Sequence, residues 1–444
     1  MPRLLLILLS AAVVCLLNVA DAEAGVVRGQ KPNVMIWVAD DQFLSSVGCY
    51  GGNPDHTPNI DRFAQQGMRF TRAYSTTSIC TPSRSALYTG MYPIRNGAHP
   101  NHSGLKQDVP SMPSILKSLG YRCALVGKAG VHNRPTRPSN TFVWDVEIDH
   151  TDQIIFGAEG DEKAAKKHRV MNYDAAKQFI TVGDQPFLLF VAASLPHAPG
   201  LTRIENGLEG YAANNWTCDA QFGRFLTMLK DAGKEDNTLV IYVSDNGSNT
   251  DRSKYTLYEA GVNVPMIVRW PGHVVPGSVC DQLVDFTDVM PTLLEIIGVE
   301  RAVESDSSMP MDGKSLLPLF ADPSKPLRND VFLSFTGLGV HDIVEPYPIR
   351  ALVTQRYKLI HNLNFQVTPH KGRGVKKCPE FELYDLSHDP EELHNLAYSA
   401  ALAEPLQSLK QRLREWSQHV GDQGMQTEYE AIAMFPELQE LKLP

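Results

Sequence analysis

Residues 34–41 have the sequence VMIWVADD, a short apolar run that ends in two carboxylates. A run that is apolar at every position is typical of a strand buried on both faces of a parallel sheet. Similar runs lie at Phe187–Val191, Leu239–Val243 and Pro265–Trp270, and helical patterns alternate with them between about residues 33 and 322. This alternation predicts an α/β fold with a large, mostly parallel central sheet flanked by helices.

Polar residues stand at the ends of three of these runs. Asp40 and Asp41 end the first run, His197 lies just beyond the second, and Asp245 and Asn246 follow the third. Open α/β sheets bind ligands at the carboxyl ends of their strands, so these side chains are candidates for one shared site. Any one of them could simply begin a polar turn. The three strand ends together favour a site.

A second unit is expected after Pro323, where short strands with tight links replace the alternating pattern. We place a catalytic domain at residues 23–325 and a C-terminal subdomain at residues 326–444. The subdomain is expected to be a small antiparallel sheet with one helix. Its predicted elements are strands at Val331–Phe335, Ile349–Val353, Tyr357–Ile360 and Glu382–Leu386 and a helix at Leu402–Trp416.

The first 22 residues are expected to be a signal peptide. Arg3 precedes an apolar run at Leu4–Leu17, and Ala20-Asp21-Ala22 matches a small-x-small cleavage site. The run is short for a membrane span, so we favour export over an N-terminal anchor and expect no stable membrane insertion after cleavage. The expected location is periplasmic or extracellular, or a lysosome-like compartment in a eukaryote.

Composition narrows the classes of partner. The formal net charge of −9 argues against nucleic acid, because phosphate backbones select basic surfaces. It does not argue against an anionic substrate, since a local basic pocket can lie within an acidic protein. The six cysteines after Cys15 lack the close-paired spacing of a zinc site.

The segment from Cys80 to Gly90 carries the most chemical information. Pro82 suits a helix start and Gly90 a helix stop, which places Cys80 at a helix N-terminus. Unpaired N–H groups favour an anion there, and Arg84 lies one turn along on the same face. Taken alone, Cys80 could equally be a buried free cysteine.

The run Cys80-Thr81-Pro82-Ser83-Arg84 resembles the Cys-x-Pro-x-Arg motif of the formylglycine-dependent sulfatases, within the alkaline phosphatase-like superfamily. The resemblance implies that a maturation enzyme oxidises Cys80 to formylglycine (3-oxoalanine). The hydrated aldehyde would then be the nucleophile that attacks sulfur. It also implies the alkaline phosphatase-like sandwich, hydrolysis of sulfate esters, and a sulfated carbohydrate as the partner.

Further motifs extend the resemblance. Asp40, Asp41, Asp245 and Asn246 are similar to the family's calcium ligands, with the residue at position 80 completing the set. Carboxylate and amide oxygens are the ligands that Ca²⁺ prefers, and Mg²⁺ is the less favoured alternative.

The resemblance also implies several catalytic residues. Arg84, Lys128 and Lys254 would supply fixed positive charge, and His197 would assist departure of the leaving oxygen. Gly127 and Lys128 begin a segment similar to the family's Gly-Lys-x-His, but three residues intervene before His132, so His132 fits only if the loop bulges.

Some assignments and alternatives stay open. His99 and His102 follow the nucleophile segment closely and could line a sugar subsite, or simply belong to a polar loop. The stretch from Asp385 to Asn395 is similar to the family's C-terminal tail. The alternatives are a phosphoesterase or phosphonate hydrolase of the same superfamily, which Cys80 disfavours, and a catalytically silent glycan-binding homologue.

Overall fold

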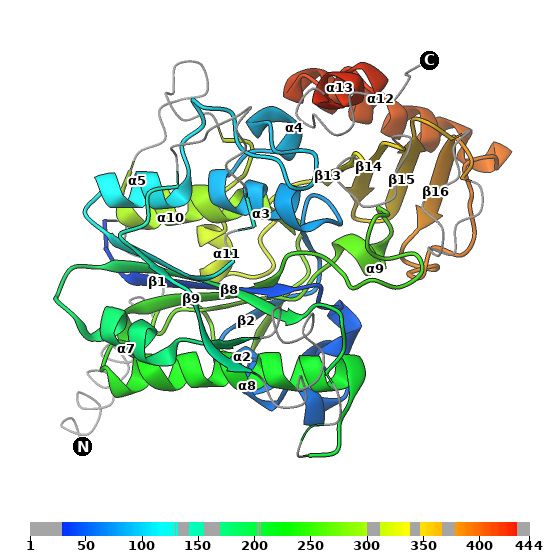
Figure 1. Cartoon of the computed structure of the whole chain (residues 1–444). Helices are drawn as coiled ribbons and strands as arrows, with labels where there is room; N and C mark the ends of the chain where they lie inside the picture. Colours follow the sequence, from blue (N-terminus) through cyan, green and yellow to red (C-terminus); the bar gives the residue numbers. More distant parts are fainter. Residues whose placement is uncertain are drawn as a thin grey trace, which may run out of the picture.

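A computed structural model describes residues 29–128, 130–131, 142–154, 169–201, 204, 206–299, 311–337, 347–365 and 378–432. The chain forms a large unit around a central sheet and a smaller unit around a second sheet (Figure 1). The predicted signal peptide, residues 1–22, lies outside the described residues. No helix within the described ranges has the length and apolar character needed to cross a membrane.

The central sheet has eight strands in the order β11-β2-β10-β9-β1-β8-β4-β5. Within this described sheet β10 runs antiparallel to both of its neighbours, and the other paired strands run parallel. The prediction of a mostly parallel sheet is therefore confirmed. The strands are β1 (Asn33–Asp40), β2 (Met68–Phe70), β4 (Arg122–Gly127), β5 (Val146–Ile148), β8 (Phe187–Pro196), β9 (Thr238–Ser244), β10 (Met266–Arg269) and β11 (Ser278–Cys280).

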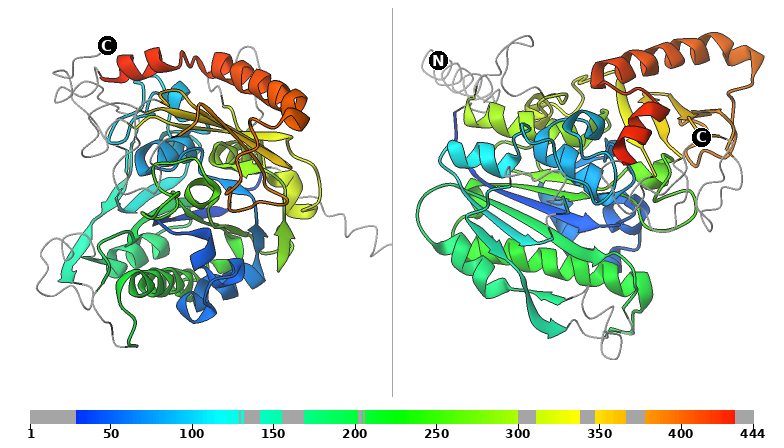
Figure 2. Two further views of the ribbon diagram at one scale, coloured as in Figure 1. Left: turned by 90° about the vertical axis from the view of Figure 1, so that its right-hand side faces the viewer. Right: turned by 45° about the horizontal axis from the view of Figure 1, so that its top comes forward.

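Helices cover both faces of this sheet (Figures 1 and 2). Val34, Ile36 and Val38 of β1 pack into the core under α3, α5, α10 and α11, whereas Met35 and Trp37 face the core under α2, α7 and α8. Both faces of β1 are therefore buried, which explains why the run is apolar at every position. These helices are α2 (Pro58–Gln66), α3 (Cys80–Thr89), α5 (Met112–Ser118), α7 (Tyr173–Thr181), α8 (Gly210–Asp231), α10 (Val289–Ile297) and α11 (Leu317–Ala321).

The smaller unit is an antiparallel sheet of β13 (Asp330–Phe335), β14 (Ile349–Thr354), β15 (Tyr357–Asn362) and β16 (Phe381–Asp385), paired in sequence order. One face packs against α12 (Ala403–Val420), and the opposite face packs against the large unit. The prediction of an antiparallel sheet with a helix is confirmed. A further helix that the sequence analysis did not predict, α13 (Met425–Ile432), follows α12.

Short elements complete the described chain. β3 (Ala73–Tyr74) pairs with β12 (Val284–Asp285), and β6 (His150–Ile154) pairs with β7 (Arg169–Met171). The single-turn helices α4 (Pro93–Asn96) and α9 (Glu259–Val262) lie in the connections. Helix α9 comes directly after the Lys254 segment and lies at the boundary between the two units (Figure 1).

Candidate active site

Strand register brings the predicted polar residues to one edge of the sheet. Ala39 of β1 lies opposite Ser244 of β9, and Asp40 lies opposite Pro196 of β8. The residues that follow each strand, including His197 and Asp245, therefore emerge side by side. Asp41 then takes a left-handed conformation with a φ of 63°, which turns the chain away from the sheet.

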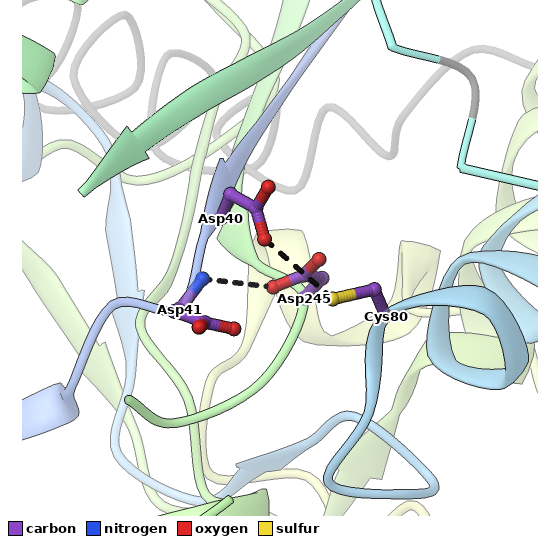
Figure 3. Close-up of side chains that lie close together, drawn as sticks. All are labelled: Asp40, Asp41, Cys80 and Asp245. Carbon is purple, nitrogen blue, oxygen red and sulfur yellow. Dashed lines mark hydrogen bonds between the residues drawn. The ribbon is translucent and has the colours of Figure 1, made fainter. Parts of the chain in front are cut away.

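Three of these carboxylates lie together, and the Cys80 sulfur points toward them (Figure 3). One potential ligand atom from each of Asp40, Asp41, Cys80 and Asp245 lies within 4.8 Å of the others, and all four residues are buried. Cys80 Sγ is 3.6 Å from Asp40 Oδ1, and the Asp41 N–H donates to Asp245 Oδ1 at 3.1 Å. Cys80 is the first residue of α3, so the helix N-terminus faces the acidic cluster as the sequence predicted.

Arg84 lies one turn along α3 and is wholly buried. Its Nε and Nη2 atoms are 2.9 and 2.8 Å from Asp245 Oδ2, and Nη1 donates to the Lys128 carbonyl at 3.0 Å. Burial alone would lower the pKa of Arg84, but the charges of Asp245 and Asp40 outweigh it and raise the pKa. Arg84 is therefore a fixed cation at the site. Gly130 leaves room for it, since a Cβ there would lie 2.4 Å from Arg84 Cδ.

Lys254 is the second buried cation. Its Nζ atom lies 2.6 and 2.8 Å from the two carboxylate oxygens of Asp41 and 3.7 Å from Cys80 Sγ. Burial opposes the charge of Lys254, but Asp41 outweighs burial and raises the lysine pKa. His197 approaches the same carboxylate, with Nε2 at 3.4 Å from Asp41 Oδ2.

Burial also acts on the acidic groups. It raises the pKa of the Cys80 thiol, against the opposing charge of Lys254, so the unmodified side chain is a neutral thiol. Burial raises the pKa of Asp245 as well, despite Arg84. At Asp40 burial is outweighed by His197 and the nearby cations, and the pKa falls. The cluster thus holds carboxylates of unequal acidity.

Two oxygen atoms in the cluster are open to a metal. Within the described residues, Asp40 Oδ2 and Asn246 Oδ1 are buried and accept no hydrogen bond. The Asn246 amide nitrogen donates to Asp41 Oδ1 at 2.7 Å, which fixes Asn246 beside the three carboxylates. This set of hard oxygen atoms fits a divalent cation such as Ca²⁺ or Mg²⁺.

The remaining predicted residues have different positions. Lys128 follows β4 and has an exposed side chain, while its carbonyl accepts from Arg84. His99 is buried and His102 is half-buried. The His102 N–H donates to Thr81 Oγ1 at 3.1 Å, so this loop lies against the first turn of α3. His132 lies outside the described residues.

The sequence analysis missed residues of α8 and the loop after β1 that hold Asp41 in place. The Tyr211 hydroxyl donates to the Asp41 carbonyl at 3.2 Å, and the Gln42 N–H donates to Ser244 Oγ at 2.8 Å. The Gln42 amide donates to Asn215 Oδ1 at 2.6 Å. These contacts join residues more than 160 positions apart, and no local pattern in the sequence marks them.

Comparison with known proteins places the site in a family. A family model described as Sulfatase matches residues 32–299, more than half of the chain. The chain belongs to the sulfatase family. A second model, described as N-sulphoglucosamine sulphohydrolase, C-terminal, matches residues 251–419 of the sulfatase. The predicted family and the predicted activity, hydrolysis of sulfuric esters, are confirmed.

Relatives share most of the length of this sulfatase. It is 31% identical over 430 residues to the ulvan-active sulfatase of Formosa agariphila, which covers 88% of this chain and 81% of the relative. It is 26% identical to N-sulphoglucosamine sulphohydrolase of Homo sapiens, covering 90% and 92%. A solved structure in complex with its substrate D-glucosamine-2-N,6-O-disulfate superposes with a TM-score of 0.69 at 20% identity, covering 89% and 99%. The last comparison confirms the fold.

Proposed function

We propose that this sulfatase removes sulfate from sulfated carbohydrates, including fragments of polysaccharides. The observation that carries the proposal is the buried cluster of Cys80, Arg84, Lys254 and three carboxylates at the carboxyl edge of the sheet. The ulvan-active sulfatase and the glucosamine disulfate complex, both similar to this chain, support a saccharide as the substrate class.

A divalent cation belongs to this proposal. Asp40, Asp41, Asp245 and Asn246, with the residue at position 80, would hold it, and Ca²⁺ suits the all-oxygen donor set better than Mg²⁺, which demands stricter geometry. When bound, it supplies positive charge that neutralises the sulfate oxygens.

The proposed nucleophile is the residue at position 80. A formylglycine-generating maturation enzyme would oxidise Cys80 to formylglycine, whose hydrated aldehyde supplies the attacking hydroxyl. Asp245, which has a carboxylate oxygen within 4.8 Å of Cys80 Sγ, would accept the proton of that hydroxyl. Lys128 and His132 would orient the second hydroxyl.

The other residues would bind charge and move a proton. Arg84, Lys128 and Lys254 would stabilise the negative charge of the transferring sulfate group. Arg84 and Lys254 are buried and held by carboxylates, and cations fixed in advance need no reorganisation during reaction. His197, beside Asp41, would protonate the leaving oxygen. His99 and His102 would line the sugar subsite next to the first turn of α3.

Export completes the proposal. Residues 1–22 would direct the chain to the periplasm, the extracellular space or a lysosome-like compartment, with residues 23–325 as the catalytic domain and 326–444 as the C-terminal subdomain. An oxidising maturation step and a saccharide substrate are both consistent with export.

The test is sulfate release from a panel of sulfated mono- and oligosaccharides, with matched phosphate esters as competitors. Protein from a host that has the maturation enzyme should release sulfate and carry an aldehyde at position 80 in its peptide mass. The Cys80→Ala variant, which has neither a thiol nor a hydroxyl group to oxidise, should lose turnover and keep its fold. Faster phosphate release would favour the phosphoesterase alternative. An unmodified thiol together with saccharide binding would favour the silent homologue.

A further inference from the structure

The segment that carries Lys254 has an unusual backbone. Arg252 and Tyr255, on either side of Lys254, both have positive φ values, 55° and 71°. Side chains other than glycine rarely adopt this conformation, and it persists only where the surroundings hold it. Contacts from outside the segment must therefore hold this backbone, from which the Lys254 side chain reaches Asp41.

A single residue of the smaller unit contacts both ends of this segment. The Glu392 carbonyl accepts a hydrogen bond from Arg252 Nη2, two residues before Lys254. The Glu392 carboxylate accepts from the Glu259 N–H at 2.6 Å, five residues after Lys254 and at the first residue of α9. Glu392 thus forms a two-point clamp around the catalytic lysine segment.

A buried lysine holds the clamp in place. Lys358 of β15 is wholly buried, and its Nζ atom lies 3.0 Å from Glu392 Oε1 and 3.0 Å from Glu259 Oε1. Two carboxylates from different units thereby share one ammonium group. Tyr74 and Asn263 of the large unit donate to the other Glu259 oxygen at 3.2 and 3.1 Å, which ties the cluster to both units.

Glu392 combines a left-handed backbone with a buried carboxylate, and both are unfavourable. It has a φ of 58° and is 1% exposed. Burial raises its pKa to about 7, although Lys358 opposes the shift. A buried acid in a left-handed conformation is hard to explain as part of a simple surface loop. It lies in the tail segment, residues 385–395, which the proposed chemistry leaves without a role.

We infer that Glu392 is a positioning residue through which the C-terminal unit sets the Lys254 ammonium group between Asp41 and Cys80. The inference rests on the proposed role of Lys254 at the active site. Glu392 does not touch the reacting atoms and acts through the backbone of residues 252–259. The C-terminal tail segment is then part of the catalytic apparatus, although it lies in a separate unit.

The test is a double-mutant cycle between Glu392 and Lys254, measured as kcat and KM for sulfate release from the sulfated saccharide that the panel above identifies. Glu392→Asp keeps the charge but shortens the side chain, so it should lose the contact with the Glu259 N–H. We expect kcat/KM to fall about 10- to 100-fold, since a 1 Å misplacement at a catalytic group can have that effect. In a Lys254→Met background the same change should alter kcat/KM by less than about twofold, because coupled residues are not additive.

Controls separate the possible failures. Glu391→Gln changes an exposed neighbour and should leave kcat/KM unchanged. Arg252→Met removes the other clamp contact and provides a second cycle should Glu392→Asp fold poorly, as judged by circular dichroism. Equal losses from Glu392→Asp in both backgrounds, or no loss in the wild-type background, would overturn the inference. Full activity of Lys254→Met alone would instead overturn the proposed role of Lys254.

Discussion

Removing the Asp40 carboxylate should abolish stabilisation of the protein by calcium. Asp40 Oδ2 is buried and accepts no hydrogen bond within the described residues, and its nearest cationic atom there is Arg84 Nη2 at 3.7 Å, so it is a candidate ligand atom. Asp40→Asn keeps the shape of the side chain but removes one negative charge from the set. A cation that binds only the folded state stabilises it by RT ln(1 + [L]/Kd), so loss of the ligand appears directly as loss of stability.

The expected shift in melting temperature depends on the calcium concentration and on the length of the chain. At a free calcium concentration of 100 times Kd the stabilisation is about 2.7 kcal/mol. The unfolding entropy of about 2.1 cal/mol/K per residue gives about 0.9 kcal/mol/K for the 444 residues. Calcium should therefore raise the melting temperature of the wild-type protein by about 3 °C. For Asp40→Asn we expect a rise below about 1 °C at the same concentration.

The assay is thermal unfolding by circular dichroism after treatment with a chelator, with and without added calcium, and with magnesium in parallel. Asp288→Asn is the matched control, because Asp288 is also a fully buried acid but pairs with Arg328 away from the cluster. The control should keep the full calcium shift even if its baseline stability falls. A full shift in Asp40→Asn, or none in the wild-type protein at millimolar calcium, would refute the assignment of Asp40 as a ligand.

Two further predictions concern a glycine and a histidine. Gly130→Ala should lower kcat/KM about 100-fold, because the new Cβ would lie 2.4 Å from Arg84 Cδ and displace the guanidinium by about 1 Å. Gly120→Ala is the kinetic control, since Gly120 also has a positive φ but open space around it. An equal loss of kcat/KM in the control would refute the steric argument. Burial, with the charges of neighbouring cations, lowers the pKa of His361 from 6.5 to about 4. Between pH 6.5 and pH 4 the unfolded chain therefore binds more protons than the folded chain, and the free energy of unfolding falls as the pH drops through this range. In His361→Phe, which can still stack on Phe381, the fall in unfolding free energy between pH 7 and pH 5 should be smaller by about 1 to 2 kcal/mol than in the wild-type protein. Urea unfolding at the two pH values measures this difference. An unchanged pH dependence would contradict the prediction.

Local sequence patterns predicted much of the fold. The apolar runs that became β1, β8 and β9 are buried on both faces, and such strands need no polar alternation. Strand direction was harder to predict, because an apolar run such as β10 has the same sequence pattern whether it lies parallel or antiparallel to its neighbour. β2, β5 and β11 have three residues each and were missed, since so short a strand carries little periodicity. The six-residue β4 was missed as well; it begins with Arg122 and ends with Gly127.

The candidate site was predicted where its residues follow strands or begin a helix. Asp40, Asp245 and Cys80 lie at such points, and register alone then brings them together. The residues that hold these site residues in place could not be predicted from strand ends or helix starts. Tyr211 contacts Asp41 across 170 residues, and Glu392 contacts Glu259, beyond the Lys254 segment, across 133 residues. The tail pattern at residues 385–395 was noticed, but nothing in it marks Glu392 as a partner of Glu259.

The charges in the cluster explain how an acidic protein can act on an anionic ester. Among the buried side chains, the three carboxylates of Asp40, Asp41 and Asp245 face two cations, Arg84 and Lys254, which leaves one negative charge when all five are ionised. The exposed Lys128 adds a positive charge close enough to lower the pKa of Asp40. Without a metal these groups offer no excess of positive charge to attract a sulfate group, and charges act more strongly there than in solvent because the local dielectric constant is low. One divalent cation reverses the sign for the five buried side chains and leaves one positive charge among them to meet the singly charged monoester. The net charge of −9 for the whole chain therefore says little about the substrate, because the sign of the field at the reacting atoms is set by these side chains and the metal that they would hold.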